Sequence, residues 1–264
     1  MAGDPMAGPV ATSTDEAGTS WVVLDRPDVR NAIDVATQEA LRDALIAAAT
    51  DGGVRAIAIT GTDPAFSAGG DLSRFDDPDH TAFRFASHDL TDVIGLVERI
   101  EKPVVAAING AATGAGAQLA LACDLRIASQ RARFLWREGH LGLLPAHGGI
   151  ARLVHLVGLG RARDLVLGGM EIDAGRAYAI GLVTQVVPHE TLRATVSDHL
   201  ARITRRSPDA YAVTKRVLQA VAGLPVGTGQ AVETLGQSLL IGTDEHRVRL
   251  RRAREARGDG RDGG

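Results

Sequence analysis

The stretch Pro103–Ser129, PVVAAINGAATGAGAQLALACDLRIAS, constrains the fold more than any other part of the chain. It predicts a buried strand over 104–108, a glycine-rich turn over 109–116 and a helix that begins behind the turn and runs through Gln118. A turn with so few side chains lets a ligand approach the main chain closely. The helix directs free N–H groups and the positive end of its dipole toward the same place. We therefore expect an electron-rich group there, either a phosphate or an oxygen that becomes negative during a reaction.

The composition of the 264 residues, 45% hydrophobic and 23% charged, fits one large globular domain with a smaller appendage. Aromatic residues make up 3%, so the expected core is aliphatic and rich in alanine. The net charge of −3 argues against a nucleic-acid partner, and no segment approaches the roughly 20 apolar residues of a membrane span. The single cysteine, Cys123, excludes an internal disulfide, fits a reducing compartment and lies in an apolar run typical of a core position. The N-terminus lacks a basic-then-apolar signal pattern, so we expect a cytoplasmic protein without a membrane partner.

The N-terminal part of the chain alternates strand and helix patterns. Residues 1–18 are rich in Ala, Gly, Pro, Thr and Asp without periodicity, and we interpret them as a disordered leader. Apolar runs predict a short strand over 21–24 and a buried strand over 54–60. Between them, Asp34 is placed to cap a helix over 35–50.

A second glycine turn follows in Asp63–Leu72, DPAFSAGGDL. Its two glycines precede Asp71, which is placed to cap a following helix. Residues 73–88 are charged, contain three phenylalanines and lack clear periodicity. Two interpretations of that segment remain open, a mobile lid near a pocket or an ordinary surface excursion. Residues 89–100 carry apolar side chains at helical spacing.

The middle of the chain continues with strands that follow one another without a helix between them. Strand-like runs occupy 124–128, 132–136 and 182–187, and helical patterns occupy 150–157 and 161–167. The order strand, strand, helix recurs about every 45 residues. It predicts an α/β fold, a spiral of stacked ββα turns, rather than a doubly wound sheet.

After Pro188 the pattern becomes entirely helical, over 192–204, 208–221, 226–240 and 243–257. We therefore predict four segments: a disordered leader (1–18), a ββα core that holds the site (19–190), a helical C-terminal subdomain (191–257) and a flexible tail (258–264).

The two glycine turns fit a carbonyl-binding site better than a nucleotide-binding site. Gly114-Ala-Gly116 lacks the rest of a dinucleotide fingerprint, because the third glycine position holds Leu119 and the nearest acidic residue that follows, Asp124, comes too early. Neither a G-x-S-x-G elbow nor a G-x-x-x-x-G-K-[ST] loop occurs. Two turns that each follow a strand and precede a helix can instead direct main-chain N–H groups at one carbonyl oxygen and stabilise its anion.

Five motifs, in this order along the chain, resemble the signatures of the enoyl-CoA hydratase/isomerase family, the crotonase superfamily. They are LDRPDVRNAI (24–33), FSAGGDL (66–72), NGAATGAGAQLALACDLRIAS (109–129), LGLLPAHGGIARL (141–153) and AIGLVTQVVP (179–188). The resemblance implies a crotonase-like fold, chemistry on an acyl-CoA thioester in fatty acid metabolism, and homotrimers or hexamers built through the C-terminal helices. It implies no separate cofactor, because coenzyme A is part of the substrate.

By the same resemblance, the main-chain N–H groups of Ala68 and Ala115 form an oxyanion hole for the thioester carbonyl. Such a donor in a dry site typically lowers the barrier by about 3 kcal/mol. The arginines of the first motif match the region that contacts the nucleotide part of CoA. The implied substrate-binding positions are Arg26, Arg30, Ser67, Gly69, Asp71, Leu72, Gly114 and His140.

The acid–base residues depart from the pattern of the family's hydratases, which use two glutamates. One of those positions holds Gln118 here, and the other holds Glu138. An amide cannot take or give a proton near neutral pH, so a one-base shuttle by Glu138 that moves a double bond is slightly preferred to hydration. The family's dienoyl isomerases carry an acidic residue where this chain has Ala146, which argues against them.

Two further functions remain open. Gln118 favours an acyl-CoA-binding protein that has lost catalysis. His140 and His147 flank the segment that follows Glu138, and some relatives that cleave carbon–carbon bonds use histidines, so a His-dependent acyl-CoA or C–C hydrolase is the other hypothesis. Ordinary loop histidines are the alternative interpretation of both, and Arg137 is a candidate partner for Glu138 or for an anionic substrate group. No spacing in the sequence predicts a metal site.

Overall fold

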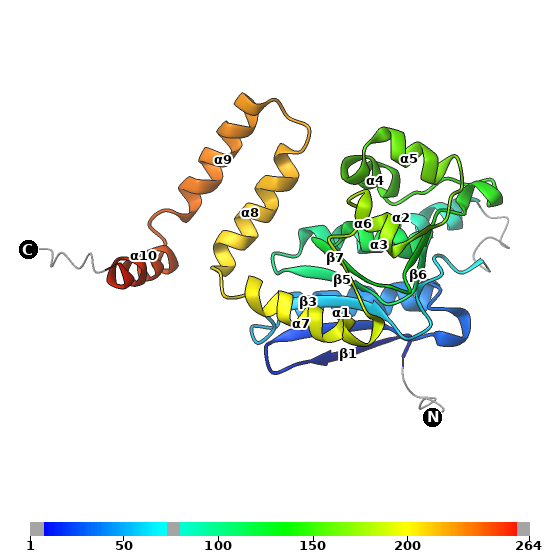
Figure 1. Cartoon of the computed structure of the whole chain (residues 1–264), viewed down its shortest axis with the longest axis horizontal. Coiled ribbons are helices and arrows are strands. Elements are labelled where there is room, and N and C mark those ends of the chain that lie inside the picture. Colours follow the sequence, from blue (N-terminus) through cyan, green and yellow to red (C-terminus); the bar gives the residue numbers. More distant parts are fainter. Residues whose placement is uncertain (1–7, 73–79, 258–264) are drawn as a thin grey trace, which may run out of the picture. The chain divides into compact units, whose positions relative to one another are not determined.

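The computed structural model describes residues 8–72 and 80–257, without the side chains of residues 80–88. Two sheets organise the first part of the chain (Figure 1). The larger sheet has six strands in the order β1 (Val10–Thr14), β2 (Thr19–Leu24), β3 (Ala56–Gly61), β5 (Val104–Ile108), β7 (Leu125–Ser129) and β10 (Gln185–Val187). The smaller sheet has four, in the order β4 (Ala65–Ser67), β6 (Ala111–Thr113), β8 (Arg133–Leu135) and β9 (Ile172–Asp173).

Each turn of the fold uses one strand from each sheet. Strand β3 is followed by β4, β5 by β6, and β7 by β8, with only a few residues between the members of a pair. Successive strands within each sheet pair in parallel, and only β1 with β2 and β8 with β9 are antiparallel. Helices then close the turns: α2 (His80–Arg99) after β4 and α3 (Ala115–Ala122) after β6. The predicted spiral of ββα turns is confirmed.

The alternation of side chains along the large sheet produces two hydrophobic layers. One face of the sheet, with Val22, Ile57 and Val104, belongs to the main core together with α1 (Val35–Thr50), α2 and α3. The other face, with Trp21 and Val105, packs against α7 (Leu192–Ile203). Both layers are aliphatic and rich in alanine, as the low aromatic content predicts.

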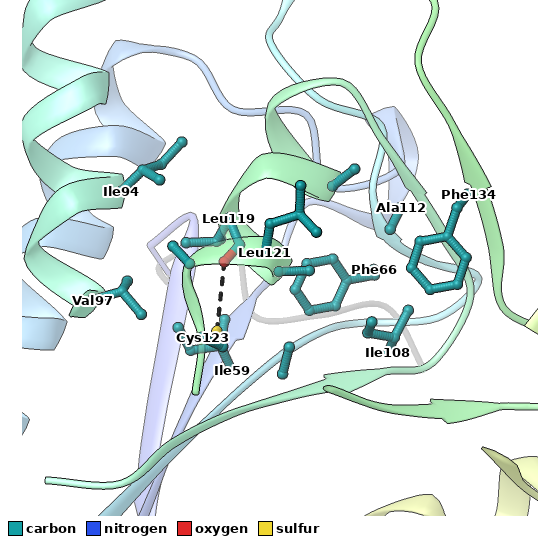
Figure 2. Packing of buried hydrophobic residues seen from close by; sticks show 14 of the residues in the cluster. Ile59, Phe66, Ile94, Val97, Ile108, Ala112, Leu119, Leu121, Cys123 and Phe134 are labelled. Atoms are coloured by element: carbon teal, nitrogen blue, oxygen red, sulfur yellow. Dashed lines mark hydrogen bonds between the residues drawn. The ribbon is translucent and has the colours of Figure 1, made fainter. Parts of the chain in front are cut away.

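Figure 2 shows the main core around α3. Leu119 and Leu121 of this helix lie beside Phe66 and Ile59 from the strands. The thiol of Cys123 is buried in the same cluster and donates to the carbonyl of Leu119 over 3.5 Å. Cys123 therefore fills a core position.

Local signals account for most of the helices. Helix α1 begins where Asp34 accepts a hydrogen bond from the Thr37 N–H, at 2.8 Å, as the capping prediction requires. Buried Arg126 donates to the carbonyls of Cys123 and Leu182, so it satisfies an acceptor at the C-terminal end of α3. The remaining helices of the first part are α4 (Gly149–Val157), α5 (Leu159–Val166) and α6 (Ala174–Ala179), together with the 3-10 turns η1 (Pro27–Val29), η3 (Glu138–Leu141) and η4 (His189–Thr191).

The chain divides into two compact units, residues 1–203 and 204–264. The second unit contains α8 (Pro208–Val221), α9 (Val226–Leu240) and α10 (Asp244–Ala256), and α8 lies side by side with α9 (Figure 1). The expected boundary at residue 191 therefore lies too early. Helix α7 belongs to the first unit because Leu192, Val196 and Leu200 pack on the large sheet.

Other expectations differ from the structure in smaller ways. The expected leader, 1–18, contains strand β1, which pairs with β2 along its whole length. Polar, irregular composition did not reveal it because an edge strand needs one apolar face at most. The segment 73–88, interpreted as a mobile lid or a surface excursion because it lacks clear periodicity, was not assigned a helix, but residues 80–88 begin α2. Residues 1–7, 73–79 and the tail 258–264 lie outside the described residues.

Across the described ranges, no helix combines the length and the apolar composition that a bilayer crossing requires.

Candidate active site

Two glycine turns, one after β4 and one after β6, come together at one edge of the small sheet. The Thr113 hydroxyl donates to the carbonyl of Ala68, with a 2.6 Å separation. A Cβ added to Gly69, whose φ is +96°, would lie 2.8 Å from the Thr113 carbonyl and 3.2 Å from the Ala115 nitrogen. A Cβ on Gly116 would lie 2.5 Å from the Cβ of Ser67. Only glycine at these two positions allows the turns to approach this closely.

The main-chain N–H groups of the first turn are almost all used. Ala68 donates to the Arg30 carbonyl at 2.8 Å, Gly69 to the Ser67 hydroxyl at 3.2 Å, and Asp71 to the Ile33 carbonyl at 3.1 Å. Gly70 pairs with Ile33 in an isolated parallel bridge whose two hydrogen bonds use its neighbours, Gly69 and Asp71. The Gly70 N–H has no acceptor within residues 8–72 and 80–257.

The expectation that Ala68 supplies a free donor is therefore wrong. Its N–H is already committed to the loop that follows β2, and an N–H with an internal acceptor is not available to a ligand. Gly70, two residues further on, is the residue of this turn whose amide is left over within the described part of the chain. Sequence position alone could not distinguish the two, because the loop from residue 26 to 33 decides which amides are used.

Asn31 holds the first turn to that loop. Asn31 is fully buried, and its main chain adopts a left-handed conformation, with φ of 58°. The amide group donates to the carbonyls of Thr62 and Ala65, both at 2.7 Å, and its oxygen accepts from the Arg26 N–H. The hydroxyl of Ser67 donates to the Asn31 carbonyl at 2.7 Å. One asparagine thus fixes both ends of β4. The motif LDRPDVRNAI did not predict this role for Asn31.

The second turn ends at the start of α3. Gly114 precedes the helix with φ of 50°, and Ala115 is its first residue. The first N–H groups of a helix have no intrahelical acceptor. Within the described part of the chain the Ala115 N–H, like that of Gly70, has no acceptor outside the helix either. Ala115 is 7% exposed, so this donor lies in a largely dry environment.

Glu138 and Gln118 form a direct pair beside the second turn. The Gln118 amide nitrogen donates to Oε1 of Glu138 over 2.8 Å. The same Oε1 lies 3.5 Å from the position of a Cβ on Gly114. Gly149 leaves the space for Gln118, because a Cβ there would lie 2.6 Å from the glutamine Cγ. The structure thus brings the predicted carboxylate to the turn that carries Ala115.

Burial raises the pKa of Glu138 above its ordinary value, although hydrogen bonds from its own main chain and from Gln118 lower it in part. Among the residues that the structure describes, the other oxygen of Glu138, Oε2, is buried without a hydrogen-bond partner, and so is Oε1 of Gln118. A carboxylate with a raised pKa and a vacant oxygen is suited to accept and return a proton.

The two arginines of the first motif differ in their surroundings. Arg26 forms ion pairs with Asp34 at 3.0 Å and with Asp71 at 3.5 Å, and it donates to the Ala32 carbonyl. It therefore links the loop to the first turn. The Arg30 side chain is exposed and has no ion pair within the described part of the chain, so it remains available to an anion. Leu72, which follows the same turn, is 60% exposed.

No hydrogen bond found among the described residues joins either histidine of this region to Glu138. His147 contacts the Thr91 hydroxyl through Nδ1, at 2.8 Å, with φ of 53°. His140 is exposed, with its ring 3.4 Å from the position of a Cβ on Gly169. Arg137, also exposed, precedes η3 without a cap interaction. These positions agree with ordinary loop residues.

Comparisons with known proteins assign the chain to a family. The enoyl-CoA hydratase/isomerase family profile matches residues 14–247, and the chain belongs to that family. A 2,3-dehydroadipyl-CoA hydratase of Escherichia coli is 34% identical over 224 residues, which cover 85% of this chain and 87% of the relative. A crotonyl-CoA hydratase of Syntrophomonas wolfei is 33% identical over 225 residues, 85% of this chain and 86% of the relative. The crystal structure of an enoyl-CoA hydratase from Bacillus anthracis superposes with a TM-score of 0.89 at 30% identity, covering 94% and 96% of the two chains.

Proposed function

We propose that this family member acts on an enoyl-CoA thioester and moves its double bond, with Glu138 as the single acid–base residue. The thioester oxygen is held by the free N–H groups of Gly70 and Ala115, which come from the two turns in contact. Removal of a proton next to the thioester places negative charge on that oxygen. Each of the two donors contributes about 3 kcal/mol to the stabilisation of such an anion in a dry site.

The Gln118–Glu138 hydrogen bond is the observation that carries the proposal. Hydration by two carboxylates requires a water between them, one carboxylate to activate it and the other to protonate the carbon. Here the second group is an amide, which has no proton to exchange near neutral pH. It also donates directly to Oε1 of Glu138 at 2.8 Å, so no water lies between these two atoms.

One base is sufficient for isomerisation. Oε2 of Glu138 takes a proton from C2 of a 3-enoyl-CoA, and the electron pair delocalises over C2, C3, C4 and the thioester oxygen. The same carboxyl group returns the proton to C4, and the double bond then lies between C2 and C3. Gln118 holds Oε1 during both steps, so the free oxygen stays directed at the substrate.

A side-by-side assay of a 3-enoyl-CoA and crotonyl-CoA tests the proposal. The wild type is expected to isomerise the first faster than it hydrates the second. Glu138→Gln should reduce isomerisation by about 10² to 10⁴, the usual contribution of a positioned acid–base group. Gln118→Glu, which restores a second carboxylate, should raise hydration. Faster hydration than isomerisation by the wild type, the reaction in the names of the relatives above, would overturn the preference.

Gln118 also supports a second candidate, an acyl-CoA-binding protein without catalysis. That candidate predicts tight binding of both thioesters and turnover of neither. A His-dependent hydrolase has less support, because His147 is bonded to Thr91 and His140 is exposed. It predicts that His140→Ala abolishes turnover and that Glu138→Gln does not.

We further propose a cytoplasmic homotrimer or a hexamer of two trimers. Helix α9 leaves large apolar side chains exposed, Leu235 at 68% and Leu239 at 69%, and Ile241 follows at 60%. Apolar surface of this kind on a helical unit favours self-association. Light scattering of the intact chain measures the number of subunits, and a monomer would contradict the proposal.

A further inference from the structure

Three buried side-chain atoms lack a hydrogen-bond partner across residues 8–72 and 80–257. They are Oε1 of Gln118, Oε2 of Glu138 and the indole Nε1 of Trp136. Folded proteins leave few buried polar groups unsatisfied, because each one costs roughly 1–3 kcal/mol. Gln118 and Trp136 are both 2% exposed, so neither atom reaches bulk solvent.

All three atoms come from two segments that are in contact. Strand β8 ends at Leu135, whose carbonyl accepts a hydrogen bond from the Gly114 N–H over 3.3 Å. Trp136 is therefore the first residue beyond the strand at the second glycine turn. Two residues later, Glu138 returns to within 3.5 Å of the Gly114 Cβ position and bonds Gln118. Trp136 also shares a buried cluster with Ala115.

The proton transfer proposed above uses only one of these atoms, Oε2 of Glu138. It leaves an acceptor, Gln118 Oε1, and a donor, Trp136 Nε1, which has no acceptor capacity of its own. A hydroxyl group can satisfy either kind of atom, because it donates and accepts at once. A methyl or methylene group leaves both atoms unsatisfied, and a carboxylate satisfies only the indole.

We propose that the acyl group of the substrate carries a hydroxyl on a carbon beyond those that exchange protons, and that Trp136 selects for it. The proposal rests on the acyl-CoA function above, but not on which reaction the enzyme catalyses. A site that hydrogen-bonds a substrate hydroxyl strongly rejects the analogue without it, since the buried polar groups are then left unpaired. Trp136 is thus a specificity-determining residue.

Binding of unreactive, saturated thioesters tests the proposal without relying on turnover. The intact chain is titrated calorimetrically with hexanoyl-CoA, 5-hydroxyhexanoyl-CoA and 6-hydroxyhexanoyl-CoA. The wild type should bind one of the hydroxylated thioesters at least about tenfold more tightly than hexanoyl-CoA. Trp136→Phe keeps the ring and removes the N–H, so it should abolish that preference.

Trp21→Phe is the matched control, because Trp21 is the other tryptophan of the chain, is 1% exposed and lies in the second hydrophobic layer. The preference of this variant should equal that of the wild type. The proposal is overturned if the wild type shows no preference, if Trp136→Phe retains it, or if both variants lose it equally. A fixed water on the indole would give the first of these results. Failure of the wild type to bind any of the three thioesters would instead overturn the acyl-CoA function itself.

Discussion

The two halves of the candidate site are built in different ways. The glycine turns consist of small residues, and hydrogen bonds from Asn31, Ser67 and Thr113 fix their main chains. The segment after β8 consists of large side chains, Trp136 and Glu138, whose polar atoms are left partly unsatisfied. The first region offers uncharged donors in a fixed position, and the second offers the groups that exchange protons or select a substrate.

This difference separates what each region controls. Main-chain N–H groups do not titrate, so the strength of the anion site is independent of pH. Glu138 is the carboxylate in the segment after β8, and burial raises its pKa. Substitutions in the turns should therefore change the rate at every pH by the same factor. Substitutions around Glu138 should change how the rate depends on pH.

The largest expected effect comes from separating the turns. Gly116→Ala places a Cβ 2.5 Å from the Cβ of Ser67 and 2.7 Å from its carbonyl oxygen, so the two turns must move apart. Loss of one donor from an oxyanion site typically costs about 10² to 10³ in kcat. We expect a loss of that size for the isomerisation of a 3-enoyl-CoA, with the same shape of pH profile as the wild type.

Gly160→Ala is the matched control for that variant. Gly160 lies in α5, and a Cβ there meets no atom within 4 Å. Alanine in a helix should leave activity unchanged and add up to about 1 kcal/mol of stability. Equal activity of Gly116→Ala and Gly160→Ala would show that the approach of the turns does not matter for catalysis.

The same contrast explains what the sequence could predict. The glycine turns and the paired strands follow from local rules, and the ββα order was predicted from them. Ala115 was named by resemblance to the family and not by a local rule. The choice of Gly70 over Ala68 depends on a hydrogen bond between residues 38 positions apart, Ala68 to Arg30, which no local pattern contains. Strand β1 was missed because its pairing with β2, and not its own composition, makes it a strand. The sequence marks Trp136 only as an apolar residue at the end of a predicted strand. Its interest comes from the structure, in which the indole N–H is buried without an acceptor among the described residues.

A smaller effect is expected from removing the amide that holds Glu138. Gln118→Met keeps the length of the side chain and removes the hydrogen bond to Oε1. That bond lowers the pKa of Glu138, so its loss should raise the pKa further. The acid limb of the pH–rate profile should then move to higher pH, because Glu138 acts as a base only when ionised. A limb that stays in place would show that Glu138 is not the group that titrates.

The smallest effect concerns stability, and its sign follows from the same pKa. Burial raises the pKa of Glu138 in the folded state above its unfolded value, so the folded chain holds this proton more tightly. Between the unfolded and the folded pKa the native state binds more protons, and stability falls as the pH rises through that interval, by at most about 1.4 kcal/mol per pH unit. Glu138→Gln carries no titrating group, so its advantage in free energy of unfolding over the wild type should grow through the interval and become constant above it. Denaturant unfolding of both proteins over a series of pH values measures this difference. An advantage that shrinks as the pH rises would mean that the ionised carboxylate is favoured by the fold, and it would remove the physical basis for treating Glu138 as the base.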